Sequence, residues 1–172
     1  MSKTYLAIDI GKQGALAVLK DGVVETYRMP MIKTDLDVHE LLDIVSKVCS
    51  DDYPHVIFEH LGVIFGSGKS TALSMGYQSG IIEAACICAG SPYTKVKAKE
   101  WQKEIFKGLE EITKPSKTAG AKPVRDTKAM ALVAVKRIFP QLKLTFGERA
   151  TVPHDGLIDA VLIAEWARRQ NL

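Results

Sequence analysis

Four acidic residues interrupt segments that otherwise read as buried. Asp9 lies in the apolar run YLAIDI, and Glu59 lies in the apolar run HVIFEH. Asp155 and Asp159 are four residues apart in HDGLIDAVLIAEW, so a helix places both on one face, in line with its apolar stripe. A buried carboxylate is costly unless it is paired or bound to a metal. Together the four acids predict a cation site inside the fold.

The ligand chemistry of this set is that of a hard divalent ion. Carboxylate oxygens without a cysteine partner suit Mg²⁺ or Mn²⁺. We expect two ions per active site, one held by Asp9 with Asp155 or Asp159 and the other by Asp9 with Glu59, which is an arrangement that hydrolyses phosphodiesters. His154 has three alternatives: it orients the attacking water, ligates the metal or begins the helix. Taken singly, each acid has the alternative of a helix cap or a surface ion pair.

A glycine-rich segment follows the strand that carries Glu59. VIFGSGKST at 63–71 looks like half of a phosphate-binding loop, but Val63 stands where the first glycine is required, which argues against ATP. Small residues with a lysine and a phenylalanine suit a nucleic acid instead, because a base can stack and a phosphate can approach. The residues expected at DNA here are Phe65, Ser67, Lys69 and Ser70. The alternative is a surface loop without a partner.

Positive charge is concentrated in one part of the chain. The formal net charge is only +3, but residues 95–128 hold ten Lys or Arg against five acids. This block predicts a polyanionic partner, with a solvated linker as the alternative. Four of these residues are expected along the DNA arms: Lys95, Lys97, Lys99 and Lys103. Four more are expected to form a basic flap that becomes ordered on DNA: Lys114, Lys117, Lys122 and Arg125.

The elements that must position these residues form a β-β-β-α-β-α-β-α-α order. Strands are predicted at 4–10, in a hairpin over 14–29, at 55–60 and at 93–96. Helices are predicted at 35–50, 70–89, from 97, 126–139 and 154–169, with a flexible loop over 107–125. The fold class is α/β, a five-stranded mixed sheet flanked by helices. Parallel pairing of the strands 4–10 and 55–60 brings Asp9 and Glu59 together.

Composition bounds the remaining possibilities. The 172 residues, with 47% apolar and 25% charged residues, predict a single domain over 1–172. No signal peptide or membrane-spanning run is apparent, so no membrane partner is expected. The odd number of cysteines, three, without zinc-ligand spacing, favours a cytoplasmic location.

The four acids in their order resemble the RuvC-type Holliday junction resolvases. The resemblance is to the smaller phage-encoded branch, within the retroviral-integrase and RNase H-like superfamily, and it covers most of the chain. AIDIGKQGALAV is similar to the first strand and hairpin, VIFEHLG to the strand with the catalytic glutamate, GYQSGIIEAAC to the next helix and HDGLIDAVLIAEWARR to the terminal helix. The four-residue spacing of Asp155 and Asp159 departs from bacterial members, which leaves open which of them shares the metal.

The resemblance implies an RNase H-like fold and a function. Such proteins are homodimers that nick four-way DNA junctions symmetrically, so branched DNA and a second copy are the expected partners, in a host cytoplasm if phage-encoded. Asp9, Glu59, Asp155, Asp159 and, less firmly, His154 would be catalytic. Phe65 would be a wedge or stacking residue. The helix at 70–89 has an apolar stripe suited to a second copy. Three rivals stay open: an RNase H-like nuclease for flaps or RNA–DNA hybrids, an actin-like ATPase fragment and a catalytically silent junction binder.

Overall fold

The centre of the protein is a five-stranded mixed sheet, as predicted. The structure, a computed structural model, describes residues 3–60, 68–118 and 120–172. The sheet has the strand order β3-β2-β1-β6-β7. Its strands are β1 (Thr4–Asp9), β2 (Ala15–Lys20), β3 (Val23–Arg28), β6 (His55–Glu59) and β7 (Tyr93–Val96). β1, β2 and β3 pair antiparallel, whereas β1 with β6 and β6 with β7 pair parallel.

The register of the parallel pair decides where two of the acids lie. Ile8 of β1 is paired with Phe58 of β6, and the next residue on each strand is Asp9 and Glu59. Because the strands run in the same direction, both acids end their strands at one edge of the sheet. The prediction that Asp9 and Glu59 meet is confirmed at the level of the backbone.

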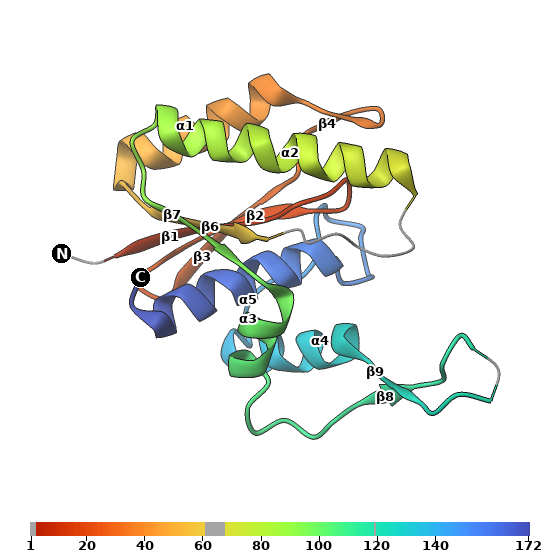
Figure 1. The fold of residues 1–172 in the computed structure, drawn as a ribbon. Coiled ribbons are helices and arrows are strands. Elements are labelled where there is room, and N and C mark those ends of the chain that lie inside the picture. The colour runs from red at the N-terminus through yellow and green to blue at the C-terminus, as the bar shows by residue number, and fades with distance from the viewer. Residues whose placement is uncertain (1–2, 61–67, 119) are drawn as a thin grey trace.

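Helices cover both faces of the sheet (Figure 1). On one side lie α1 (Val38–Asp52) and α2 (Lys69–Cys88), and on the other α3 (Ala98–Ile105), α4 (Thr127–Ile138) and α5 (Asp155–Gln170). The central strands are therefore apolar on both faces, which is why each acid in them stands out in the sequence. Of the described residues, no helix combines the length and apolarity needed to cross a membrane.

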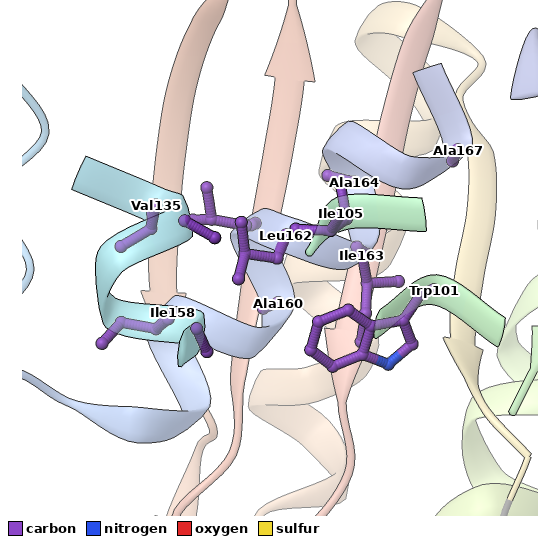
Figure 2. Close-up of a cluster of buried hydrophobic side chains, with 14 of the residues drawn as sticks. Trp101, Ile105, Val135, Ile158, Ala160, Leu162, Ile163, Ala164 and Ala167 are labelled. Atoms are coloured by element: carbon purple, nitrogen blue, oxygen red, sulfur yellow. The ribbon is translucent and has the colours of Figure 1, made fainter. Parts of the chain in front are cut away.

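The helix α5 packs directly on the sheet. Ala7, Ala15 and Ala17 of the strands share a buried cluster with Ala160 and Ala164 of the helix. Small side chains on both surfaces let the helix backbone approach the strands closely, and Trp101 and other bulky residues from α3 and α4 fill the outer side (Figure 2). This close packing fixes the height of α5 above β1, and with it the position of the acids in its first turns.

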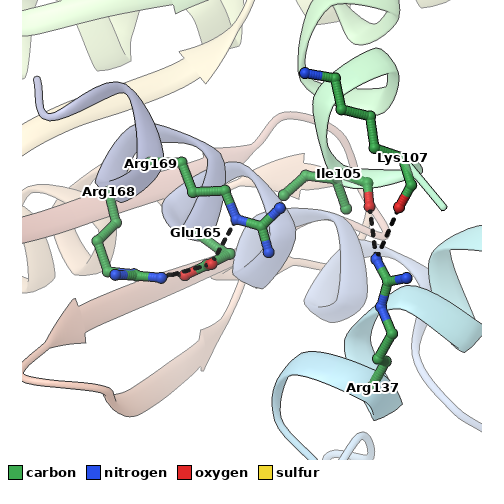
Figure 3. Close-up of polar contacts among 6 residues, drawn as sticks. All are labelled: Ile105, Lys107, Arg137, Glu165, Arg168 and Arg169. Carbon is green, nitrogen blue, oxygen red and sulfur yellow. Dashed lines mark hydrogen bonds and ion pairs between the residues drawn. The ribbon is translucent and has the colours of Figure 1, made fainter.

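Polar contacts hold the far end of α5 (Figure 3). Glu165 is buried, and its carboxylate accepts hydrogen bonds from Arg168 and Arg169 at 2.7–2.8 Å. Arg137 of α4 donates to the main-chain carbonyls of Ile105 and Lys107, at 3.3 Å each. The hydrogen bonds of Arg137 join α4 to the end of α3, and both helices also contact α5. The three helices on this face therefore form one layer.

Two local expectations from the sequence are wrong. The helix predicted from 35 begins at Val38, because Asp35–Leu36 forms β5 and pairs with β4 (Met31–Ile32), and the Asp37 side chain caps the helix by accepting from the Glu40 N–H at 3.1 Å. The predicted loop 107–125 contains a two-stranded hairpin, β8 (Thr113–Lys114) with β9 (Val124–Arg125), which projects away from the sheet (Figure 1).

Candidate active site

Three elements contribute four carboxylates to one region. Asp9 ends β1, Glu59 ends β6, and Asp155 and Asp159 lie in the first two turns of α5. The pKa of Asp9 is raised well above its ordinary value by burial, and then by the negative charges of Asp159, Glu59 and Asp155 in that order. Three of these acids, Asp9, Asp155 and Asp159, also line one cavity, so they lie in one region of the fold.

The pKa values of the other two inner acids are raised as well, mainly by burial. Burial, followed by the charges of Glu59 and Asp155, raises the pKa of Asp159 to about 7. Burial also raises the pKa of Glu59, although a hydrogen bond from Trp101 opposes this shift. The inner carboxylates therefore carry more negative charge than their surroundings balance, which is the electrostatic condition for binding a cation.

A glycine allows α5 to approach the end of β1. A Cβ atom at Gly156 would lie 2.1 Å from the carbonyl oxygen of Gln13 and 2.8 Å from Oδ2 of Asp9. On the other side of this contact, a Cβ atom at Gly14 would lie 2.1 Å from the carbonyl oxygen of Asp9. Both positions are therefore restricted to glycine by backbone contact. The sequence HDGLID thus places its glycine where the helix touches the strand that carries Asp9.

Three of the four acids line a cavity of about 790 Å³, and Glu59 is not among its lining residues. Asp9, Asp155 and Asp159 line it together with Gln13, Lys128 and His154. The cavity lies between the loop joining β1 to β2, the start of α5 and Met75 of α2. Its volume is large enough for a phosphate group with its neighbouring sugars.

Asp155 differs from the other acids in its surroundings. Its side chain is 52% exposed and forms an ion pair with Lys128 of α4. The expectation that Asp155 continues the buried stripe of the helix is therefore wrong: it lies on the outer side of the first turn of α5, at the cavity, whereas Gly156, Leu157 and Ile158 of the same turn are buried. An exposed ion pair of this kind contributes little to stability, so a divalent ion competes with Lys128 at small cost.

Trp101 contacts one of the four acids, which could not be predicted from the sequence. Its side chain is 1% exposed, and its indole Nε1–H donates to Oε1 of Glu59 at 2.8 Å. Its ring belongs to the buried core between α5 and the helices that cover it. The available signal was chemical: a buried indole N–H needs an acceptor, and a half-buried Glu on the neighbouring strand is a suitable one.

His154 begins α5, which was one of its three alternatives. Its Nδ1 accepts from the Leu157 N–H at 3.2 Å, so this nitrogen carries no proton and Nε2 does. Burial, and then the charge of Arg28, lower the pKa of the imidazole, which favours the neutral ring. The cap uses the lone pair of Nδ1, while the protonated Nε2 leaves a role with water as a prediction.

The residues fit a divalent ion in chemistry, but not yet in spacing. The donors are all carboxylate oxygens, and the raised pKa values of Asp9 and Asp159 reflect a missing positive charge. Within the ranges that the structure describes, no three His, Cys, Asp or Glu side chains are grouped closely enough to hold a metal ion. Binding would therefore have to draw the carboxylates together, and the predicted pair of ions stays a prediction.

Comparison with known proteins identifies the fold. By sequence, no family profile and no curated protein matches the chain. By structure, it matches Thermus thermophilus RuvC in complex with a Holliday junction substrate, with a TM-score of 0.63 and 17% identity over 98% of this chain and 94% of that one. The chain has the fold of RuvC. A further Thermus thermophilus RuvC structure matches with a TM-score of 0.57 and 20% identity over 98% and 96% of the two chains.

On this RuvC fold, the residues predicted to contact DNA divide into three groups. Phe65 and Ser67 lie outside the described residues, while Lys69 and Ser70 are exposed in the first turn of α2. Five of the other residues predicted to contact DNA are exposed lysines for which no ion pair is described: Lys97, Lys99, Lys103, Lys117 and Lys122. The remaining three have intramolecular contacts: Lys95 pairs with Glu83 at 2.6 Å, Lys114 with Asp126 at 3.1 Å, and Arg125 lies 5.4 Å above the Phe106 ring.

Lys95 and Lys97 belong to different elements. The strand β7 ends at Val96, and Lys97 is the N-cap residue of α3. The main-chain N–H of Lys97 donates to Oε2 of Glu100 at 3.4 Å, as in a capping box at the start of a helix. The two lysines therefore belong to different elements, and each has to be tested as a DNA contact by itself.

Proposed function

We propose that the protein is a metal-dependent endonuclease that nicks four-way DNA junctions. The observation that carries this proposal is the meeting of Asp9, Glu59 and Asp159 at one edge of a RuvC-type sheet, with the pKa of each raised. A sheet edge that gathers uncompensated carboxylates beside a cavity suits metal-assisted phosphodiester hydrolysis. The structural neighbour bound to a Holliday junction substrate supports the choice of branched DNA.

Each acid has a defined part in the proposed reaction. Asp9, whose pKa is raised by the charges of all three other acids, would ligate both ions, with Glu59 completing one site and Asp155 or Asp159 the other. Bound Mg²⁺ or Mn²⁺ would supply a Lewis acid and lower the pKa of water. Trp101 holds the Glu59 carboxylate in place through its indole N–H. Lys128 would release Asp155 and remain beside the cavity, where its charge favours the phosphate.

A symmetric junction calls for two active sites, and α2 offers a surface for a second copy. Leu73 and Tyr77, one helical turn apart, are 77% and 56% exposed. Apolar side chains of this size on one helical stripe favour burial against a partner, and a twofold axis lets the same stripe serve both copies.

The three cysteines are free thiols, which suits the reducing cytoplasm proposed for the enzyme.

A panel of substrates tests the proposed function against its rivals. The wild-type protein is incubated with a mobile four-way junction, a linear duplex, a flap and an RNA–DNA hybrid, each with Mg²⁺ and with EDTA. Paired symmetric nicks in the junction with Mg²⁺ alone are expected. Equal cutting of the linear duplex would reject junction selectivity, and preferred cutting of flaps or hybrids would favour another RNase H-like nuclease. Junction binding without any cutting would favour a catalytically silent binder. Thermal stabilisation by ATP in the absence of DNA would favour an ATPase.

A further inference from the structure

A second hollow, of about 430 Å³, lies beside the carboxylate cavity. The two hollows share Gly11, Gln13 and Met75 as lining residues, so they are immediate neighbours. The other walls of the second hollow come from the loop between β1 and β2 and from the first half of α2, and they include Lys12, Ser70, Thr71, Ser74 and Gln78. A strand held at the carboxylates would therefore have its next nucleotide within reach of this hollow.

Gln78 gives the second hollow an unmet hydrogen-bonding demand. The residue is 2% exposed, and its Nε2 donates to Oγ of Ser74 at 3.3 Å. Its Oε1 is buried and has no hydrogen-bond partner within the part of the chain that the structure describes. Leaving a buried carbonyl unpaired lowers stability, so a ligand that brings a donor into the hollow would be favoured.

The lining divides into two ends of different chemistry. Near the start of α2, Lys12 and the first turn of the helix provide positive charge, and the N-cap Gly68 has no side chain to cap the helix. Gln78 lies about 12 Å farther along the helix from Ser70, given the rise of an α-helix. The unpaired group there is Oε1 of Gln78, an acceptor that repels phosphate oxygens. The hydroxyl oxygen of Ser74 already accepts from Gln78, so its O–H is left to donate.

We infer that the hollow at Gln78 takes an unstacked nucleobase of the DNA strand that lies at the carboxylates. An acceptor beside a donor matches the edge of an unpaired base, which carries an N–H next to an acceptor nitrogen or oxygen, whereas a phosphate offers acceptors only. The base must leave the helical stack to reach a buried amide, and this costs least where strands exchange. The inference rests on the proposed function and adds a consequence: a base requirement at one position beside the cut.

A substitution cycle on protein and DNA tests this inference through binding alone. Asp9→Asn provides a protein that does not cut, and Asp9→Asn with Gln78→Leu is compared with it on junctions carrying one abasic site at each position near the cut. At one position the abasic site should lower the affinity of Asp9→Asn about tenfold and leave that of the double variant unchanged. At the same position, the fluorescence of 2-aminopurine should increase when the junction binds Asp9→Asn, and should increase far less when it binds the double variant.

Controls separate the other outcomes. Asp9→Asn with Gln141→Leu, which alters a different hollow, should behave as Asp9→Asn does. Methylphosphonate at each linkage is the parallel test for phosphate, and coupling of Gln78 to a methylphosphonate in place of an abasic site would overturn the inference. Abasic effects that are equal with and without Gln78 would overturn it as well.

The stability of Gln78→Leu provides a readout that a structural role would move in the opposite direction. Removing an unpaired buried carbonyl should leave Tm unchanged or raise it. A fall of several degrees, without any change in the DNA measurements, would show that Gln78 has an internal partner such as a buried water, and the inference would be wrong. If Asp9→Asn binds the junction and the linear duplex equally well, both the proposed function and the nucleobase site are rejected. If it prefers the junction but no abasic position couples to Gln78, only the nucleobase site is rejected.

Discussion

At the scale of single residues, the Trp101–Glu59 hydrogen bond is the contact whose removal should be most informative. Trp101→Phe keeps an aromatic ring in the core and deletes the indole donor at 2.8 Å from Glu59. The nicking rate should fall about 10- to 100-fold, as for the loss of a contact that orients a metal ligand, with junction affinity unchanged. Single-turnover cleavage and equilibrium binding of the same junction measure the two quantities.

Lost packing must be separated from the lost donor. Trp101→Phe should lower the free energy of unfolding by about 1–3 kcal/mol, because the smaller ring leaves a space. Ile105→Val, on the same helix and fully buried, is the matched control, since it lowers packing by about 0.5–1.5 kcal/mol without touching Glu59. Equal losses of nicking in both variants would mean that Trp101 acts through packing alone.

The raised pKa of Asp159 predicts how stability depends on pH. Its pKa is about 7 in the folded protein against an ordinary value of 3.8, so the folded state binds more protons between these values. The free energy of unfolding of the metal-free protein should therefore fall as pH rises from about 4 to about 7. Asp159→Asn should flatten this slope, and Mg²⁺ should raise Tm more at pH 8 than at pH 5. Denaturant titrations across pH check both, and a slope unchanged in Asp159→Asn would contradict the assignment.

Two of the acids could be predicted from the sequence because each breaks an apolar strand. Asp9 and Glu59 are recognised from neighbours on the same strand, and local sequence is sufficient for that. Trp101 and Lys128 could not be assigned to the site, because their contacts depend on how α3 meets β6 and how α4 meets α5. Those distances are set by packing between elements far apart in the chain.

At the scale of elements, the contact between α5 and the end of β1 should tolerate glycine alone. Gly156→Ala would bring a Cβ atom to 2.1 Å from the Gln13 carbonyl oxygen, and the obstacle is backbone, so the helix itself has to shift. The free energy of unfolding should fall by about 1–3 kcal/mol, with loss of nicking, since Asp159 moves with the helix. Chemical denaturation and cleavage assays measure both.

A glycine in open surroundings provides the control for this substitution. Gly80 lies inside α2, and a Cβ atom there meets no atom within 4 Å. Gly80→Ala should raise the free energy of unfolding by about 0.5–1 kcal/mol, because alanine restricts the unfolded chain. If Gly156→Ala behaves as Gly80→Ala does, the close approach of α5 to β1 is not present in solution.

Elements of the sheet and its long helices were predictable, whereas the small hairpins were not. Hydrophobic periodicity over six or more residues predicts β1, β2 and α5. The strands β5, β8 and β9 have two residues each, so no period is visible in them. The β8–β9 hairpin depends on side chains such as Lys114, which pairs with Asp126, and Arg125, which lies over Phe106, and neither contact follows from local sequence.

At the scale of the whole molecule, α2 should join two copies. Leu73→Glu places a charge in the proposed interface and should convert a dimer of about twice 18.9 kDa into a monomer. Val23→Glu is the matched control, because Val23 is similarly exposed, at 71%, on the edge strand β3. Light scattering coupled to size-exclusion chromatography measures the mass. A monomeric wild-type protein, or dissociation by both substitutions, would contradict the assignment of the interface to α2.

The measurement that tests the central claim most directly is calorimetric titration of Mn²⁺ into the wild-type protein and Asp9→Asn at pH 7, in two buffers of different protonation enthalpy. The wild-type protein should bind Mn²⁺ saturably and release protons, since the pKa of Asp159 is raised to about 7 and part of this group is protonated at this pH. Asp9→Asn should bind far more weakly. Equal binding by both proteins, or no binding by the wild-type protein, would contradict a metal centre built from these carboxylates.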